Sequence, residues 1–204
     1  MEIQLTSEQK RQKFLWEVRD LVVGAMLPLV IMLLFSCTII MFADSDDLAV
    51  QLVAVIGGDI LLAAAYVTFG RKNGATAYDR FYSNQTKRSL NSSEKQVIYR
   101  TGEYALWKGF VIPLISCIPY IIFQLVNIFA PNTVCEFALR YAFGWAYYPL
   151  HIAGLSEALN FIWIVIPVAA HAIGYYTGMR KAERVQAELE AQIAEGKNKK
   201  KRRK

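Results

Sequence analysis

The chain has 204 residues, a formal net charge of +6 and 54% hydrophobic residues, and its mean hydropathy is +0.25. This length suits one domain, and these averages are only slightly above those of soluble proteins. The three cysteines, Cys37, Cys117 and Cys135, have no paired spacing, which excludes a disulfide framework and a cysteine-rich zinc site. The distribution of apolar residues along the chain therefore has to decide the class of protein.

Four long apolar segments account for nearly half of the chain. Apart from His171, which can take up a proton, they contain a single charged side chain, Asp59. The segments cover approximately residues 21–43, 48–70, 109–130 and 158–179. A helix needs about 20 apolar residues to cross the hydrocarbon core of a bilayer, and open sheets cannot replace helices there. The sequence predicts an all-α integral membrane bundle of four transmembrane helices over residues 21–179.

The basic residues predict the orientation of this bundle. All but one of the 23 Lys and Arg residues lie before the first span, between spans two and three, or after span four, and the exception is Arg140. Because cytoplasmic loops carry an excess of Lys and Arg, we expect both termini to be cytoplasmic and the protein to be a multi-pass protein of the cytoplasmic membrane. The segments outside the spans are then a cytoplasmic tail, a cytoplasmic loop, an outer segment and a basic cytoplasmic tail: residues 1–20, 71–108, 131–157 and 180–204.

The outer segment is rich in aromatic residues. Between Val134 and Pro149 it contains Phe137, Tyr141, Phe143, Trp145, Tyr147 and Tyr148. It is too short to cross the membrane and return, so we expect a helix at the outer interface, with its rings at headgroup level. The alternative is a lid that grips a ligand.

Two further helices are expected on the cytoplasmic side. Ser93-Glu94-Lys95-Gln96 fits a capping box that opens a short helix towards span three. Residues 180–195 are strong helix formers, with a narrow apolar stripe of Ala182, Val185, Leu189 and Ile193. This stripe could lie on the bilayer or pack against the cytoplasmic loop.

The two halves of the chain share short motifs. Spans one and three begin Gly-x-x-x-Pro-Leu, at Gly24 and Gly109, and spans two and four end Tyr-x-Thr-x-x-Arg-Lys, from Tyr66 and Tyr175. The shared order favours a parallel internal repeat about an axis along the membrane normal. The alternative is convergence, because Pro, Gly and basic ends are common in membrane helices.

Asp59 and His171 form the candidate intramembrane polar site. Asp59 lies near the middle of span two, where a charge costs about 2.5–3.5 kcal/mol on insertion scales. It follows Gly57 and Gly58, which let a neighbouring helix approach closely. Counted from the ends of the spans, His171 lies within about 5 Å of the same depth, so the two side chains could pair. The functional interpretation is a proton or cation relay, or a charge that docks a partner helix, and the alternative is a carboxyl group that holds the bundle.

The C-terminal tail is the second candidate contact site. Its basic side chains are Lys197, Lys199, Lys200, Lys201, Arg202, Arg203 and Lys204. Basic residues next to a membrane are attracted to anionic lipid, which is the contact we expect first. The same charge could bind RNA or the ribosome, although nucleic acid is the less expected partner, or it could act only as a topology signal.

The ending from Gly174 to Lys181, which reads Gly-Tyr-Tyr-Thr-Gly-Met-Arg-Lys, resembles the endings of small multi-pass proteins of unknown function in bacterial cytoplasmic membranes. The start of span three, Lys108-Gly109-Phe110 leading to Ile118-Pro119-Tyr120, is similar to them too. The resemblance covers the second half of the chain and implies no activity. We expect no enzyme activity, no metal and no cofactor, because zinc, phosphate-loop and hydrolase motifs do not occur. The expected function is that of an accessory or scaffold component with a membrane-protein partner or a second copy, and the alternative is a small transporter or transport subunit that uses Asp59.

Overall fold

The computed structural model describes residues 7–43, 45–90, 102–154 and 157–201, and within these ranges all regular elements are helices. In chain order the helices are α1 (Ser7–Ala43), α2 (Leu48–Leu90), α3 (Lys108–Phe129), α4 (Thr133–Ala142), α5 (Gly144–Ile152), the 3-10 helix η1 (Glu157–Ile164) and α6 (Val165–Lys201). The all-α class predicted from the sequence is confirmed.

Four helical stretches are long and apolar enough to span a membrane, and together they cover the four predicted segments except for Ala130 and Ala158. They are Ser7–Ala43, Leu48–Asn84, Lys108–Phe129 and Leu159–Glu195. Most of their apolar surface is not covered by the rest of the chain, since only 17–39% of the residues in each apolar window are buried. Apolar side chains on the outside of a bundle are what a hydrocarbon solvent requires.

The helices at the end that carries the two termini extend well beyond the apolar segments. The sequence predicted a tail before residue 21 and a loop after Gly70, whereas α1 begins at Ser7 and α2 continues to Leu90. Residues 75–90 contain no proline, so nothing in the local sequence stops the helix. The helix predicted over residues 180–195 is the continuation of α6. The capping box at Ser93-Glu94-Lys95-Gln96 lies outside the described residues.

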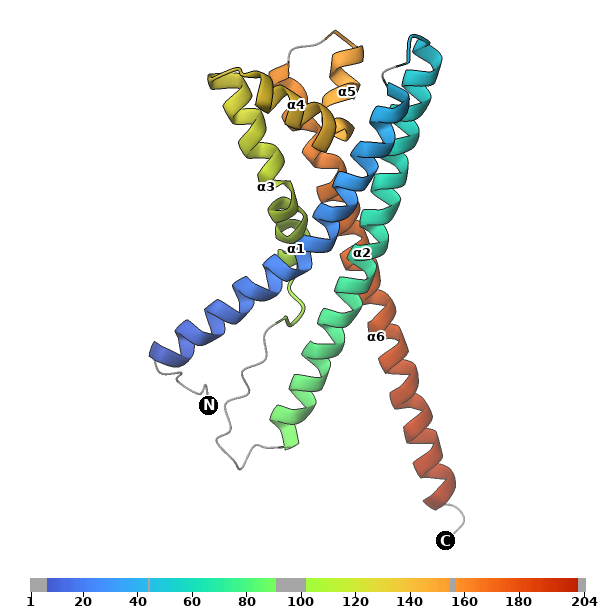
Figure 1. The fold of residues 1–204 in the computed structure, drawn as a ribbon. Helices are drawn as coiled ribbons and strands as arrows, with labels where there is room; N and C mark the ends of the chain where they lie inside the picture. Colours follow the sequence, from blue (N-terminus) through green and yellow to red (C-terminus); the bar gives the residue numbers. More distant parts are fainter. Residues whose placement is uncertain (1–6, 44, 91–101, 155–156, 202–204) are drawn as a thin grey trace.

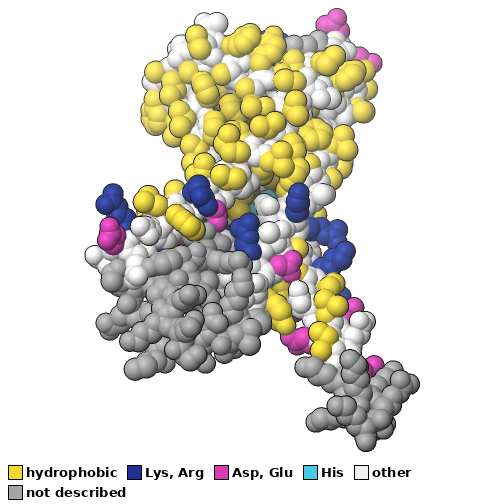
Figure 2. Space-filling model, turned by 60° about the horizontal axis from the view of Figure 1, so that its bottom comes forward, with side chains coloured by type: hydrophobic (Ala, Val, Ile, Leu, Met, Phe, Trp, Pro, Cys, Tyr) yellow, Lys and Arg dark blue, Asp and Glu magenta, His cyan; other side chains and the backbone are white. Residues whose placement is uncertain are grey.

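The arrangement has two distinct ends (Figure 1). Helices α4 and α5 lie at one end, here called the cap end, together with the turn between α1 and α2. At the other end, here called the terminal end, α2 and α6 separate from each other, and the first half of α1 leans away from both. Figure 2 shows a mainly apolar surface over the cap end, and Lys and Arg side chains below it. The charged residues are therefore concentrated where the long helices separate.

Glycines bring α2 and α6 into backbone contact, and this is the most extensive helix pair in the molecule. A Cβ atom at Gly70 or Gly74 would overlap the carbonyl oxygen of His171 or Tyr175, and one at Gly174 or Gly178 would overlap that of Val67 or Arg71. The two Gly-x-x-x-Gly segments thus face each other reciprocally, as small residues do at close crossings of membrane helices. The residues predicted as the matching ends of a repeat lie in this crossing, and the duplication itself stays a prediction.

The cap differs from the single outer helix that the sequence predicted. The chain breaks at Phe143 (φ −130°, ψ 33°), which separates α4 from α5. Phe137 and Tyr141 are exposed, whereas four aromatic side chains point inward: Phe143, Trp145, Tyr147 and Tyr148. These four rings therefore face the protein interior, and the headgroup level predicted for the aromatic rings stays a prediction. The four rings belong to the same buried core as Tyr66 and Tyr120. The cap closes one end of the bundle, and its aromatic rings pack into the space between the helices.

Candidate functional site

Asp59 lies on the side of α2 that faces the bundle. Val55, Leu62 and Tyr66, on the same face of the helix, are all buried. One oxygen of the Asp59 carboxyl group, Oδ1, is buried and has no hydrogen-bond partner among the described residues. Next to it, a Cβ atom at Gly58 would lie 2.5 Å from Ile39 of α1, whereas nothing lies within 4 Å of one at Gly57. Gly58 therefore allows the approach of α1 that the sequence predicted, and Gly57 does not take part.

His171 is fully buried on α6, and both of its ring nitrogens have partners. Nδ1 lies 2.8 Å from the carbonyl oxygen of Gly109, and Nε2 lies 3.3 Å from Nδ2 of Asn73. A carbonyl oxygen only accepts hydrogen bonds, so Nδ1 carries the proton. Nε2 of the neutral ring then accepts from the Asn73 amide.

A proline explains why a histidine is needed at this point. Pro113 lies inside α3 and has no backbone N–H, so the carbonyl of Gly109, four residues earlier, loses its partner within the helix. His171 donates the missing hydrogen bond from the neighbouring helix, which is how proline is accommodated in membrane helices. The geometry makes His171 a residue that holds α3 against α6.

The predicted pairing of Asp59 with His171 is wrong. His171 contacts Asn73, which lies about four helical turns, or about 21 Å, from Asp59 along α2. Equal depth of Asp59 and His171 would require Gly70 and Met179, the ends of their spans, to lie at the same level. The glycine crossing instead sets Gly70 against His171, which moves α6 by more than two turns relative to that arrangement.

A second polar site, here called the inner pocket, lies at the terminal end where α1, α2 and α3 separate. It is a cavity of about 300 Å³ lined by Glu17 and Asp20 of α1, Lys72 and Arg80 of α2, and Lys108 of α3. Apolar residues that begin the predicted spans, including Leu21 and Ile112, form another part of its wall. Motif reasoning missed this site, since its charged residues come from three helices and share no local pattern.

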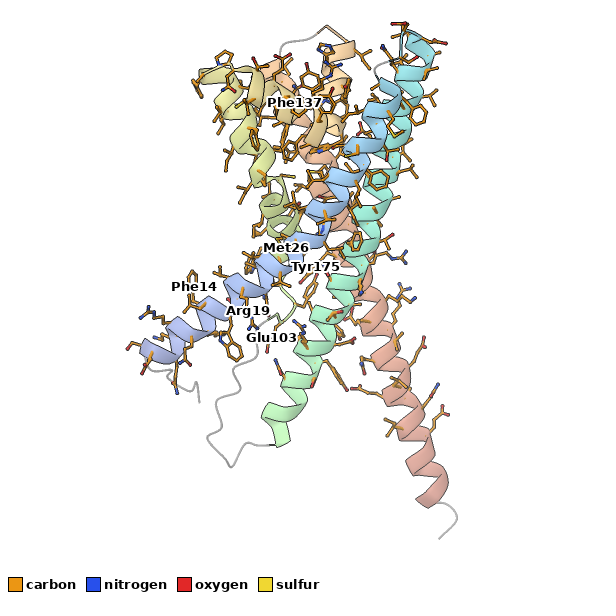
Figure 3. The ribbon with its side chains drawn as sticks, in the orientation of Figure 1. Phe14, Arg19, Met26, Glu103, Phe137 and Tyr175 are labelled. Carbon is orange, nitrogen blue, oxygen red and sulfur yellow. The ribbon has the colours of Figure 1, made fainter. Side chains whose placement is uncertain are left out.

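The charged groups of the inner pocket are held by several contacts. Nη1 of Arg80 lies 3.8 Å from Oδ2 of Asp20, a long and half-exposed ion pair. The Lys108 side chain is buried and donates from Nζ to the Glu103 carbonyl oxygen at 2.9 Å. Figure 3 shows Glu103 and Tyr175 near the point where α1 leaves the bundle.

The segment that leads from Gly102 to α3 borders the inner pocket, and Gly102 is part of the pocket lining. Gly102 has φ +79°, a backbone conformation that favours glycine. The backbone N–H of Tyr104 donates to the Ala77 carbonyl oxygen at 3.1 Å, and its ring stacks on Tyr175 with 5.2 Å between centroids. Burial against these groups raises the pKa of the Tyr104 phenol. Tyr104 is therefore protonated at neutral pH and serves as packing surface.

The predicted contact site in the C-terminal tail is not described at the level of side chains. The α6 backbone continues to Lys201, but the side chains of Lys197 and Lys199–Lys201 lie outside the described residues, as do Arg202, Arg203 and Lys204 entirely. Attraction of the tail to anionic lipid stays a prediction. Among the described residues, no group of three His, Cys, Asp or Glu side chains could hold a metal ion.

No protein family, no curated protein and no solved structure matches this chain. The function has to be inferred from the molecule itself.

Proposed function

We propose that this protein is a non-enzymatic accessory or scaffold component of the cytoplasmic membrane, which binds a partner protein through the part of α6 that extends beyond the bundle. The observation that carries the proposal is an apolar stripe on an otherwise charged helix. Val185, Leu189 and Ile193 are 44%, 46% and 57% exposed, and their spacing of four places them on one face. No described part of this chain covers them.

The occupant that suits the stripe is an amphipathic helix of another membrane protein. An exposed row of apolar side chains at this spacing is the pattern by which helices pack side by side. Acidic residues flank the row, among them Glu183, Glu188 and Glu190, so a partner helix with basic flanks would be complementary. A second copy of this chain would bring like charges together.

We infer the orientation from the distribution of charge. The Lys and Arg residues gather at the terminal end, and the positive-inside rule supports a cytoplasmic position for that end and for both termini. The cap end would then face outward, with the exposed Phe137 and Tyr141 of α4 at the outer headgroups.

Replacing Leu189 by Glu is expected to release the partner. Wild-type protein, purified from native membranes in mild detergent, should carry a stoichiometric partner, and Leu189→Glu should lose it because a carboxylate is then buried in an apolar contact. The matched control is Ala191→Glu, which adds the same charge to the opposite face of the same helix.

Either of two results would contradict the proposal: partner retention in Leu189→Glu, or equal loss in both variants. A reporter fused after Lys204 has to be cytoplasmic in the same cells, which checks the orientation independently.

A second candidate function is that of a small transporter or transport subunit that uses Asp59. The observation that favours it is the buried oxygen of Asp59, which lacks a hydrogen-bond partner among the described residues. A carboxyl group in this position inside an apolar span is a common feature of ion and proton pathways.

Replacing Asp59 by Asn separates the two functions. If Asp59 is a relay, wild-type protein in liposomes conducts protons or a cation, and Asp59→Asn abolishes the flux while thermal stability is nearly unchanged, because the amide keeps the shape of the side chain. The control, Asp46→Asn, changes an exposed acid at the cap end and should conduct normally. If wild-type protein gives no flux, or Asp59→Asn is strongly destabilised, the relay is ruled out.

A further inference from the structure

We propose that the inner pocket binds the phosphodiester headgroup of a phospholipid from the leaflet at the terminal end of the bundle. This inference goes beyond the proposed function, since neither the α6 stripe nor a partner protein takes part in it.

The basic wall of the pocket is preformed on one face of α2. Lys72, Thr76 and Arg80 all line the pocket, and their spacing of four residues stacks them on successive turns. Two cations and a hydroxyl group in a row are donors that suit phosphate oxygens. Lys108 adds a third cation from α3. An ammonium group has three donors, and the described residues provide one acceptor for it, the carbonyl oxygen of Glu103.

The opposite wall limits the charge of the ligand. Glu17 and Asp20 of α1 face the three cations, so the formal charge of the five side chains is +1. A phosphodiester carries one negative charge and would neutralise this site. Free inorganic phosphate carries more negative charge near neutral pH and would be repelled by the two carboxylates. The balance of charge therefore favours a phosphodiester over free phosphate.

The pocket also lies at the right depth for a headgroup. Leu21 and Ile112 in its wall begin the apolar spans one and three, whereas Lys72 lies just beyond the end of span two and Lys108 just before span three. In Figure 2 the Lys and Arg side chains lie directly below the apolar surface. Lipid phosphates occupy this boundary, just outside a hydrocarbon core of about 30 Å. Basic pockets between membrane helices at this level are known lipid sites.

The first half of α1 supports the same placement. Phe14, Val18 and Val22 are 65%, 40% and 43% exposed and lie along one face, whereas Glu17 and Asp20 lie on the face that lines the pocket. A helix with one apolar and one charged face lies in the membrane interface. With the apolar face in lipid, α1 would form a wall beside which a headgroup can enter. The cavity volume of about 300 Å³ is at the lower end of small-molecule sites, which cover about 300–1,000 Å³.

The test measures lipid binding by full-length protein in a phosphate-free detergent solution, using native mass spectrometry. Phosphatidylglycerol is expected to bind at one tight site. The double variant Lys72→Gln/Arg80→Gln should bind it about tenfold or more weakly, since each cation near the headgroup contributes comparably. Both side chains are exposed, so the variant should unfold at the same temperature as wild type when no lipid is present.

Three comparisons make the test decisive. The matched control Lys10→Gln/Arg11→Gln removes the same charge from exposed positions of α1 outside the pocket and should bind phosphatidylglycerol like wild type. A galactolipid with the same acyl chains but no phosphate should not occupy the site. Inorganic phosphate at the same concentration should not displace the lipid. Equal loss in both double variants, tight binding of the galactolipid, or displacement by inorganic phosphate would each overturn the proposal.

Discussion

Gly74→Ala is expected to destabilise the protein strongly, although it adds only one methyl group. The new Cβ atom would overlap the carbonyl oxygen of Tyr175, which belongs to the backbone of α6 and cannot rotate away. The two helices would have to separate along the whole crossing. Overpacking of a close contact costs typically about 1–3 kcal/mol, and here a rigid backbone receives the clash, so we expect the upper part of that range. The thermal unfolding midpoint in detergent would measure it.

Gly57→Ala is the matched control, because it is the same substitution on the same helix. Nothing lies within 4 Å of a Cβ atom at Gly57, so the change should be neutral or should stabilise the helix by about 0.5–1 kcal/mol. Equal midpoints for the two variants would show that α2 and α6 do not cross at Gly74.

The number and position of the apolar spans could be predicted from the sequence, because a long apolar run is a local property. The ends of the helices could not be predicted in the same way. Hydropathy changes at Gly70, but the backbone of α2 continues, since the polar residues that follow are compatible with a helix. A chain can therefore pass from lipid into water without leaving the helical conformation.

The error over Asp59 and His171 has a related cause. A depth counted from the ends of the spans is correct only for upright helices in register. The glycines that set the true register, Gly70 with Gly74 and Gly174 with Gly178, were visible in the sequence, but their spacing alone does not say which pairs meet. The role of His171 had a better signal: Pro113 leaves the Gly109 carbonyl without a partner, so some neighbouring donor was required.

The inner pocket had no comparable signal. Its acids and cations are ordinary surface charges when each helix is considered alone, and only the tertiary arrangement brings α1, α2 and α3 together around them. The inward-facing rings of the cap could not be predicted from the sequence either. Aromatic rings suit both a lipid interface and a packed core, so the composition of residues 134–149 could not decide which rings face inward.

Trp145→Ala is expected to have the largest effect of any single truncation in the cap. Trp145 is fully buried, and its ring lies 5.5 Å from that of Tyr120 on α3, between centroids. Removing a buried tryptophan ring costs about 3–5 kcal/mol, since the surrounding side chains cannot fill the space. Unfolding by denaturant in mixed micelles would measure the loss of free energy.

Two further substitutions test whether burial of the ring causes the loss of stability in Trp145→Ala. Phe137 on α4 is 59% exposed, and its ring stacks on that of Tyr141 with 4.2 Å between centroids, so Phe137→Ala should cost about 1 kcal/mol or less. Trp145→Phe should also cost much less than Trp145→Ala, because it keeps an aromatic ring and removes an N–H that has no hydrogen-bond partner among the described residues. If Trp145→Ala and Phe137→Ala instead cost the same small amount, both rings lie in lipid or detergent. The interior position of the cap aromatics would then be wrong, and the headgroup placement predicted from sequence would stand for all six.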